Sequence, residues 1–86
     1  TEIVNQGKIQ VFPNPAQDYL NVRFSNVQYA LPEKLEIFSV SGQMVFQIQV
    51  NSSFTQIDLR DFTTGIYELR FWWGNEQFRK KLIISK

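Results

Sequence analysis

The alternation of apolar and polar residues with a period of two is the feature that most constrains the fold of this chain. Residues 43–50 are the clearest case, because apolar residues at 44, 46, 48 and 50 alternate with glutamines at 43, 47 and 49, with Val45 as the exception. Such a period lines up one apolar face along a β-strand, whereas a helix would spread the same side chains around its circumference. The segment is therefore predicted to be a half-buried strand.

Further segments of this kind, separated by turn residues, run along the whole chain. The predicted strands are residues 8–12, 18–24, 35–40, 43–50, 53–59, 65–73 and 77–84. No segment of ten or more residues carries the apolar stripe of a helix. The pattern predicts one all-β domain, an immunoglobulin-like β-sandwich of about seven antiparallel strands.

Short polar pairs between the segments predict tight turns. The three pairs are Ser41-Gly42, Asn51-Ser52 and Gly74-Asn75. Glycine supplies the positive φ that a two-residue hairpin needs, so the first and third pairs are the stronger signals and the second is a weaker one.

Two other connections have a recognisable chemistry. Pro13-Asn14-Pro15 predicts a stiff turn, because proline fixes φ and removes a backbone donor. Tyr67, two residues after Gly65, resembles the tyrosine corner of immunoglobulin-like sandwiches, in which the hydroxyl bonds to backbone upstream. We expect Gly65 to supply the sharp bend before that strand.

The composition excludes most catalytic chemistry. The 86 residues contain no His and no Cys, which rules out Ser-His-Asp and Cys-His nucleophiles, thiol redox sites and the usual zinc sites. Asp58 and Asp61 are the remaining carboxylate candidates, but they flank a turn and are expected to bond to loop amides. We predict no enzyme activity, no cofactor and no metal.

The charge is distributed unevenly. Four of the nine basic residues lie in the last eight positions, and the rest of the chain has five basic against eight acidic residues, a net charge of −3. This basic end is too small to track nucleic acid phosphates, so no nucleic acid partner is expected. No apolar run is long enough to insert in a membrane, and Thr1 is not followed by the pattern of an N-terminal export signal.

Three motifs occur in an order that resembles the C-terminal sorting domain of the Bacteroidetes type IX secretion system. They are an aromatic-Pro-Asn-Pro turn, a hairpin centred on a glycine, and an Asp-Leu run that ends in Gly-x-Tyr before a basic last strand. The matching positions are Phe12, Pro13, Asn14, Pro15, Gly42, Asp58, Leu59, Gly65 and Tyr67. Ser39 and Phe62 replace the Asp and Leu that the family usually has, but Ser39 can still bond a turn amide and Phe62 keeps an apolar anchor.

The resemblance implies that residues 8–86 are a C-terminal sorting domain and that residues 1–7 are the remnant of a linker to an N-terminally fused cargo domain. It also implies that the domain is non-catalytic and that it passes, with its cargo, through the periplasm to the outer membrane surface or the medium. The implied partners are the type IX translocon and a surface sortase that cleaves the domain and attaches the cargo to the cell surface.

We expect the last strand and the adjoining hairpin to be the signal that the translocon reads, by strand addition to an exposed edge with charged side chains. The predicted recognition residues are Gly74, Asn75, Arg79, Lys80, Lys81, Leu82, Ile83, Ile84, Ser85 and Lys86. Charges on an edge strand also prevent aggregation, which is the plainer interpretation of the same residues.

Trp72-Trp73 leaves another interpretation open, a carbohydrate-binding or spacer module of a secreted protein. Alternation lets only one of the pair face inward, so we expect Trp73 in the core and Trp72 over a sheet face; Tyr19 and Tyr29 are similar cases. A third alternative is an uncleaved shuttle component of the secretion machinery. An exposed edge strand also predicts a weak homodimer.

Overall fold

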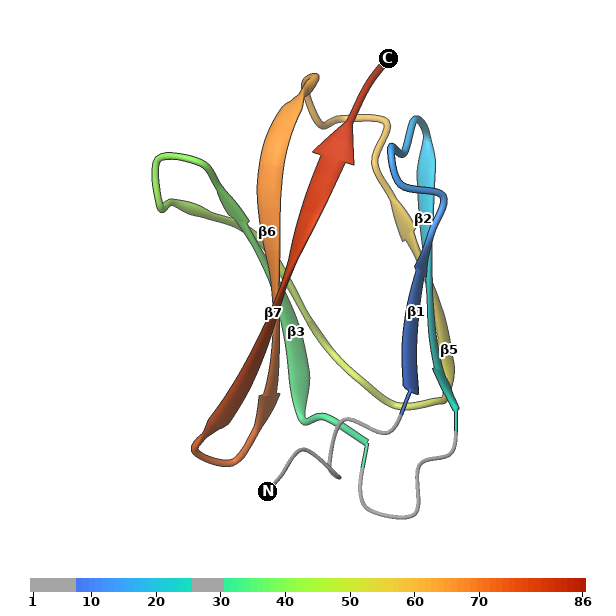
Figure 1. Cartoon of the computed structure of the whole chain (residues 1–86), viewed down its shortest axis with the longest axis vertical. Helices are drawn as coiled ribbons and strands as arrows, with labels where there is room; N and C mark the ends of the chain where they lie inside the picture. Colours follow the sequence, from blue (N-terminus) through green and yellow to red (C-terminus); the bar gives the residue numbers. More distant parts are fainter. Residues whose placement is uncertain (1–7, 26–30) are drawn as a thin grey trace.

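The computed structural model describes residues 8–25 and 31–86, which form seven strands and no helix, hence none that could cross a membrane (Figure 1). The strands are β1 (Lys8–Phe12), β2 (Tyr19–Ser25), β3 (Lys34–Ser39), β4 (Met44–Gln49), β5 (Phe54–Asp58), β6 (Gly65–Trp73) and β7 (Glu76–Ile84). Each predicted strand is present, with its ends displaced by at most one residue. The predicted linker remnant at residues 1–7 and Tyr29 lie outside the described residues.

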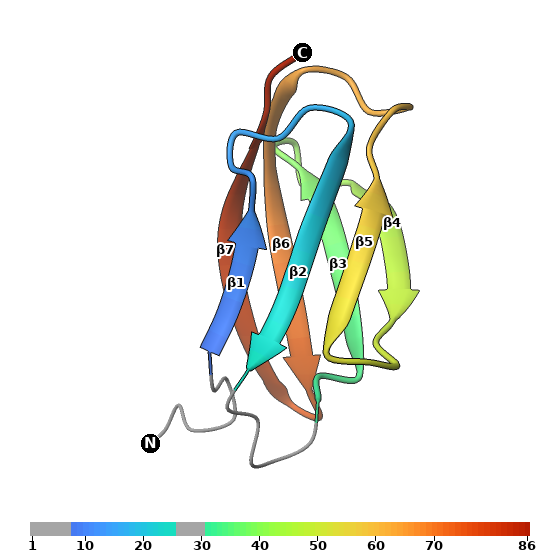
Figure 2. The same cartoon turned by 90° about the vertical axis from the view of Figure 1, so that its right-hand side faces the viewer.

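The strands form two sheets that face each other. One has the order β1-β2-β5 and the other β4-β3-β6-β7, and every strand pair is antiparallel (Figures 1 and 2). This arrangement confirms the all-β sandwich predicted from the two-residue period. It also leaves β1, β5, β4 and β7 at sheet edges.

The turn predictions are confirmed at two places and wrong at two. Gly42 and Gly74 have φ of 92° and 59°, in the left-handed region that favours glycine. Asn51-Ser52 joins no hairpin, because β4 and β5 belong to different sheets. Gly65 does not have a positive φ, and a Cβ built on it would lie 3.7 Å from Tyr67 Cε1, an ordinary contact. The bend before β6 therefore does not need glycine.

The core lies between the inner faces of the two sheets. Its buried residues are Ala16, Leu20, Val22, Phe24, Leu35, Ile37, Ile57, Leu59, Tyr67, Leu69, Phe71, Leu82 and Ile84. Phe24 from one sheet meets Phe71 from the other edge to face, with ring centroids 5.9 Å apart. Because there is no Cys, this burial replaces the disulfides that staple many small domains.

The tyrosine corner predicted from the spacing is present. The Tyr67 hydroxyl donates to the Thr63 carbonyl over 2.8 Å. Phe62 packs edge to face against the Tyr67 ring, with centroids 5.7 Å apart, so it is the apolar anchor that was expected. At the β3–β4 turn the Gln43 amide donates to Ser39 Oγ over 3.3 Å, so serine does bond the turn amide.

Replacing Tyr67 by Phe should lower the free energy of unfolding by about 1 kcal/mol, because the Thr63 carbonyl loses its donor. Urea unfolding of the whole chain measures this change. Tyr19→Phe is the matched control, since Tyr19 is on the outer face of its sheet and is 39% exposed. Equal losses in the two variants would contradict a structural role for the corner.

Candidate recognition surface

The predicted signal lies on β7, an edge strand that pairs with β6. Alternate side chains of β7 point to opposite faces of the sheet. Leu82 and Ile84 point into the core and are 0% exposed, whereas Arg79 and Lys81 point outward and are exposed. In the folded domain, Leu82 and Ile84 thus hold the strand in place and present no side chain to a receptor.

The structure separates the two ends of the predicted signal. Gly74 and Asn75 are exposed in the β6–β7 turn, at the opposite end of the nine-residue strand from Ser85 and Lys86 (Figure 1). At about 3.3 Å per residue, roughly 30 Å of strand lies between them. A single small contact cannot include both ends, and the basic residues lie between them.

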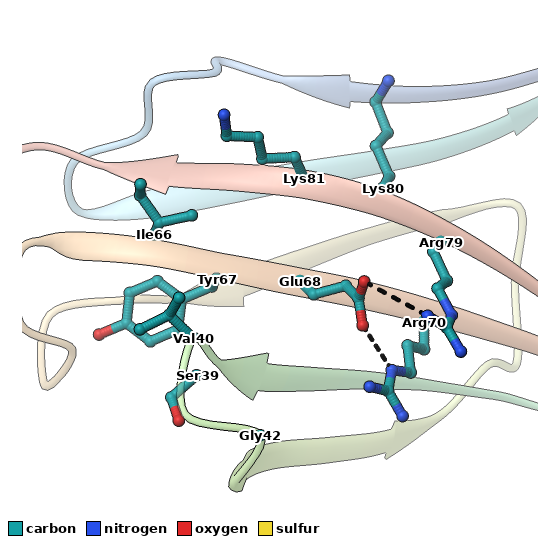
Figure 3. Close-up of a pocket in the computed structure, with 10 residues that line it drawn as sticks. All are labelled: Ser39, Val40, Gly42, Ile66, Tyr67, Glu68, Arg70, Arg79, Lys80 and Lys81. Atoms are coloured by element: carbon teal, nitrogen blue, oxygen red, sulfur yellow. Dashed lines mark hydrogen bonds and ion pairs between the residues drawn. The ribbon is translucent and has the colours of Figure 1, made fainter.

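We call Arg79, Lys80 and Lys81 the basic segment. A shallow cavity of about 470 Å³ lies beside it (Figure 3). It is lined by Ser39, Val40, Gly42, Ile66, Tyr67, Glu68, Arg70, Arg79, Lys80 and Lys81. These residues come from the β3–β4 turn and from β6 and β7, so the antiparallel register brings together segments that are far apart in sequence.

One carboxylate in this cavity is shared between two arginines. Glu68 Oε1 lies 2.7 Å from Arg70 Nε, and its Oε2 lies 4.0 Å from Arg79 Nη1. Arg70 is also stacked over the Phe38 ring, with its guanidinium carbon 3.9 Å from the ring centroid. Arg70 is therefore fixed by the sheet face, whereas Arg79 is farther from Glu68 and donates from its Nε to Gln77 Oε1 over 2.7 Å.

The two lysines of the segment have no ion pair among the described residues. Figure 3 shows both side chains extending past β7 on the side away from β6, while Arg79 turns toward Glu68. With four cations and one carboxylate, the lining of the cavity has a net charge of +3. The field around β7 therefore favours an anionic partner.

The Pro-Asn-Pro turn covers part of the β7 edge, which the sequence did not indicate. Asn14 Nδ2 donates to the Lys81 carbonyl and Asn14 Oδ1 accepts from the Ile83 amide, both over 3.1 Å. Ala16 continues the pairing, donating to the Ile83 carbonyl and accepting from the Ser85 amide over 2.8 Å each. We call these four hydrogen bonds the clasp. The side chain of Asn14 takes the place of a strand's backbone amide.

Lys86 is tied to the loop between β5 and β6. Its ammonium donates to the carbonyls of Leu59 over 2.7 Å and of Arg60 over 3.1 Å, and its backbone amide donates to Thr64 Oγ1 over 3.1 Å. Although exposed, Lys86 already satisfies two loop carbonyls, which distinguishes it from Lys80 and Lys81.

The tryptophan pair divides as predicted. Trp73 packs against the core, and Trp72 lies on the outer face, where its Nε1 donates to Glu36 Oε1 over 2.7 Å. Glu36 is 7% exposed and also lies 3.6 Å from the Lys34 ammonium. Trp72 and Trp73 therefore do not form a flat sugar-binding platform together.

Asp58 bonds locally, as predicted for a turn carboxylate. It accepts from the backbone amide of Arg60 over 2.9 Å and from the Arg60 guanidinium over 2.8 Å. These hydrogen bonds lower the pKa of Asp58 from 3.8 to about 2, and they raise the pKa of Arg60 above its usual range. Both side chains are largely exposed, so the pair contributes little to stability.

Comparison with known proteins points to one family. The sequence profile of the secretion system C-terminal sorting domain matches residues 10–85, which include all three motifs. An ulvan lyase of Nonlabens ulvanivorans is 30% identical to the chain over 79 residues, covering 90% of the chain and 14% of the lyase. The chain thus spans only a small part of the length of that relative.

Replacing Asn14 by Ala should expose the β7 edge to solvent at Lys81 and Ile83, because both side-chain hydrogen bonds of the clasp are lost. Amide hydrogen exchange at Ile83 should accelerate about tenfold, the equivalent of one hydrogen bond. Asn14→Asp keeps the acceptor for Ile83 and should have a smaller effect. Asn51→Ala is the control, and unchanged exchange at Ile83 in Asn14→Ala would contradict the clasp.

The pKa of Asp58 gives a pH prediction. The folded-state pKa of Asp58, about 2, is below the ordinary value of 3.8. The small stabilisation of the folded domain by the Asp58–Arg60 pair is therefore complete above about pH 4 and is lost as the pH falls through 2. In Arg60→Gln the pKa of Asp58 should rise toward 3.8, as measured by carboxyl carbon NMR titration. Arg23→Gln should leave it unchanged, and a midpoint near 2 in Arg60→Gln would refute the assignment.

Proposed function

The chain belongs to the secretion system C-terminal sorting domain family of type IX secretion, and we propose that it directs a fused cargo protein through the outer membrane without catalysing any reaction. The observation that carries the proposal is the family match over residues 10–85, nearly the entire sequence. Membership implies export through the outer membrane, to the cell surface or beyond it.

The comparison with the ulvan lyase supports a cargo signal over a shuttle component of the machinery. The chain matches 14% of that enzyme, so in that relative the matching region is one part of a much longer protein. By analogy, we propose that a separate N-terminal domain carries the activity of the whole protein. Passage through the periplasm, cleavage by a surface sortase and attachment of the cargo complete the proposed route.

The signal itself is proposed to be the exposed basic part of β7, centred on Arg79, Lys80 and Lys81. These residues form the most basic segment of the chain, and they lie on a sheet edge. The translocon would read the folded domain, since the apolar residues Leu82 and Ile84 of the same strand are buried in the core. The placement of Trp72 and Trp73 gives no support to a carbohydrate-binding module.

A reporter fused to residues 1–86 tests the proposal in a cell with a working type IX system. Combined Arg79→Gln, Lys80→Gln and Lys81→Gln should reduce surface display of the reporter to background and leave it in the periplasm. Substitution is a sharper test than deleting β7, because deletion also removes Leu82 and Ile84 from the core.

The matched control removes the same amount of charge elsewhere, with Arg23→Gln, Lys34→Gln and Arg60→Gln. Circular dichroism and thermal unfolding of both purified variants establish that they fold. Surface display that survives the β7 substitutions would refute the assignment of the signal, and equal loss in both variants would show that overall charge matters instead.

A further inference from the structure

Among the four edge strands, β7 is the longest. β1 and β5 have five residues each, and β4 has six, with an irregularity in its pairing with β3 between Ile37 and Phe38. Short or irregular edges are poor templates for pairing, whereas a long regular edge invites another strand. β7 has nine residues in an unbroken register with β6.

The clasp closes only one half of this edge. The groups that it uses belong to Lys81, Ile83 and Ser85, so odd-numbered residues direct their backbone away from β6. By the same alternation, the amides and carbonyls of Gln77 and Arg79 point to that side. No hydrogen bond within the described part of the chain occupies them, and we call residues 77–81 the open edge.

Positive charge flanks the open edge on both faces of the sheet. Arg79 and Lys81 are on the outer face, and Lys80 is on the inner-face side, paired in register with the buried Leu69. Figure 3 shows the two lysine side chains reaching past the strand on its open side. A strand that added here would meet cations on both of its faces.

We propose that the open edge is a strand-addition site for an acidic extended segment of a partner protein. The backbone of Gln77 and Arg79 supplies the hydrogen bonds, and carboxylates on alternate sides of the added segment pair with the three cations. The clasp limits the pairing to residues 77–81, because it occupies the Lys81 carbonyl and the edge groups of Ile83 that follow, so Lys81 offers only its amide. This inference rests on the proposed sorting function and names the chemistry of the partner that reads the signal.

Charge selects this partner over a second copy of the chain. Antiparallel pairing of two open edges centred on Arg79 would place that residue beside its own copy, with the lysines of both copies close by. Like charges directly opposite each other destabilise a sheet. The same cations that repel a copy attract an acidic segment, which reconciles protection against aggregation with recognition.

A short peptide of the repeating sequence Glu-Glu-Thr-Thr, which as a strand presents glutamates on both of its faces, tests the proposal on the 86-residue chain. Its binding should slow amide exchange at Gln77 and Arg79 and shift their amide resonances, with Ile83 unaffected. A peptide with lysine in place of glutamate should not bind. Absence of binding by the glutamate peptide, or protection confined to other strands, would overturn the inference.

Two substitutions separate backbone pairing from simple charge attraction. Arg79→Pro removes the amide on the open side without breaking a bond to β6, and proline is tolerated at such edge positions. Arg79→Gln removes the charge and keeps the amide. Proline should weaken peptide binding about tenfold more than glutamine does, the equivalent of about one hydrogen bond. Equal weakening by the two would overturn strand addition.

A peptide N-methylated at alternate residues repeats this test without changing the protein. It keeps the carboxylates and loses the amides needed for pairing, so it should bind no better than the lysine peptide. Binding equal to that of the unmodified peptide would overturn strand addition.

The export assay separates the strand-addition hypothesis from the hypothesis that the open edge is the sorting signal. Export that depends on the basic residues without peptide binding refutes strand addition alone, whereas peptide binding in a chain whose export is unchanged by Arg79→Pro refutes the sorting role of the open edge.

Discussion

Burial of one face of each sheet is the interaction on which the rest of this structure depends. Without disulfides, the two sheets are held together by side chains such as Phe24 and Phe71 that meet across the core. Burial also fixes the direction of every other side chain, because a shift of one residue would turn each strand inside out. The exposed positions of Arg79 and Lys81 thus follow from the burial of Leu82 and Ile84.

Much of the fold could be predicted because its signals are local. The two-residue period located each strand, and the spacing of Gly65 and Tyr67 located the tyrosine corner. The hairpin prediction at Asn51-Ser52 failed because the answer there depends on which sheet a strand joins. Asn51-Ser52 has the composition of a hairpin turn, but β5 pairs with β2, whose register buries Ile57.

The candidate site was only partly predictable for the same reason. The basic segment is visible in the sequence, but the clasp joins Asn14 to residues 67 and 69 positions away, and no local pattern connects them. Glu36 is similar: a glutamate is expected at the surface, yet this one is 7% exposed and accepts a hydrogen bond from Trp72 Nε1. Such contacts form when segments that are distant in sequence pack together. A short stretch of sequence therefore contains no pattern that predicts them.

The clasp also decides how the domain responds to mechanical load. Ala16 and Ile84 form a parallel bridge, so the segment after the first strand runs alongside the end of the last strand in the same direction. A force pulling these two segments apart along their length loads the clasp bonds together, in shear, instead of breaking them one after another. A domain joined in this way resists extension until several bonds fail at once, and its lifetime under tension is set by the rate of that one rupture.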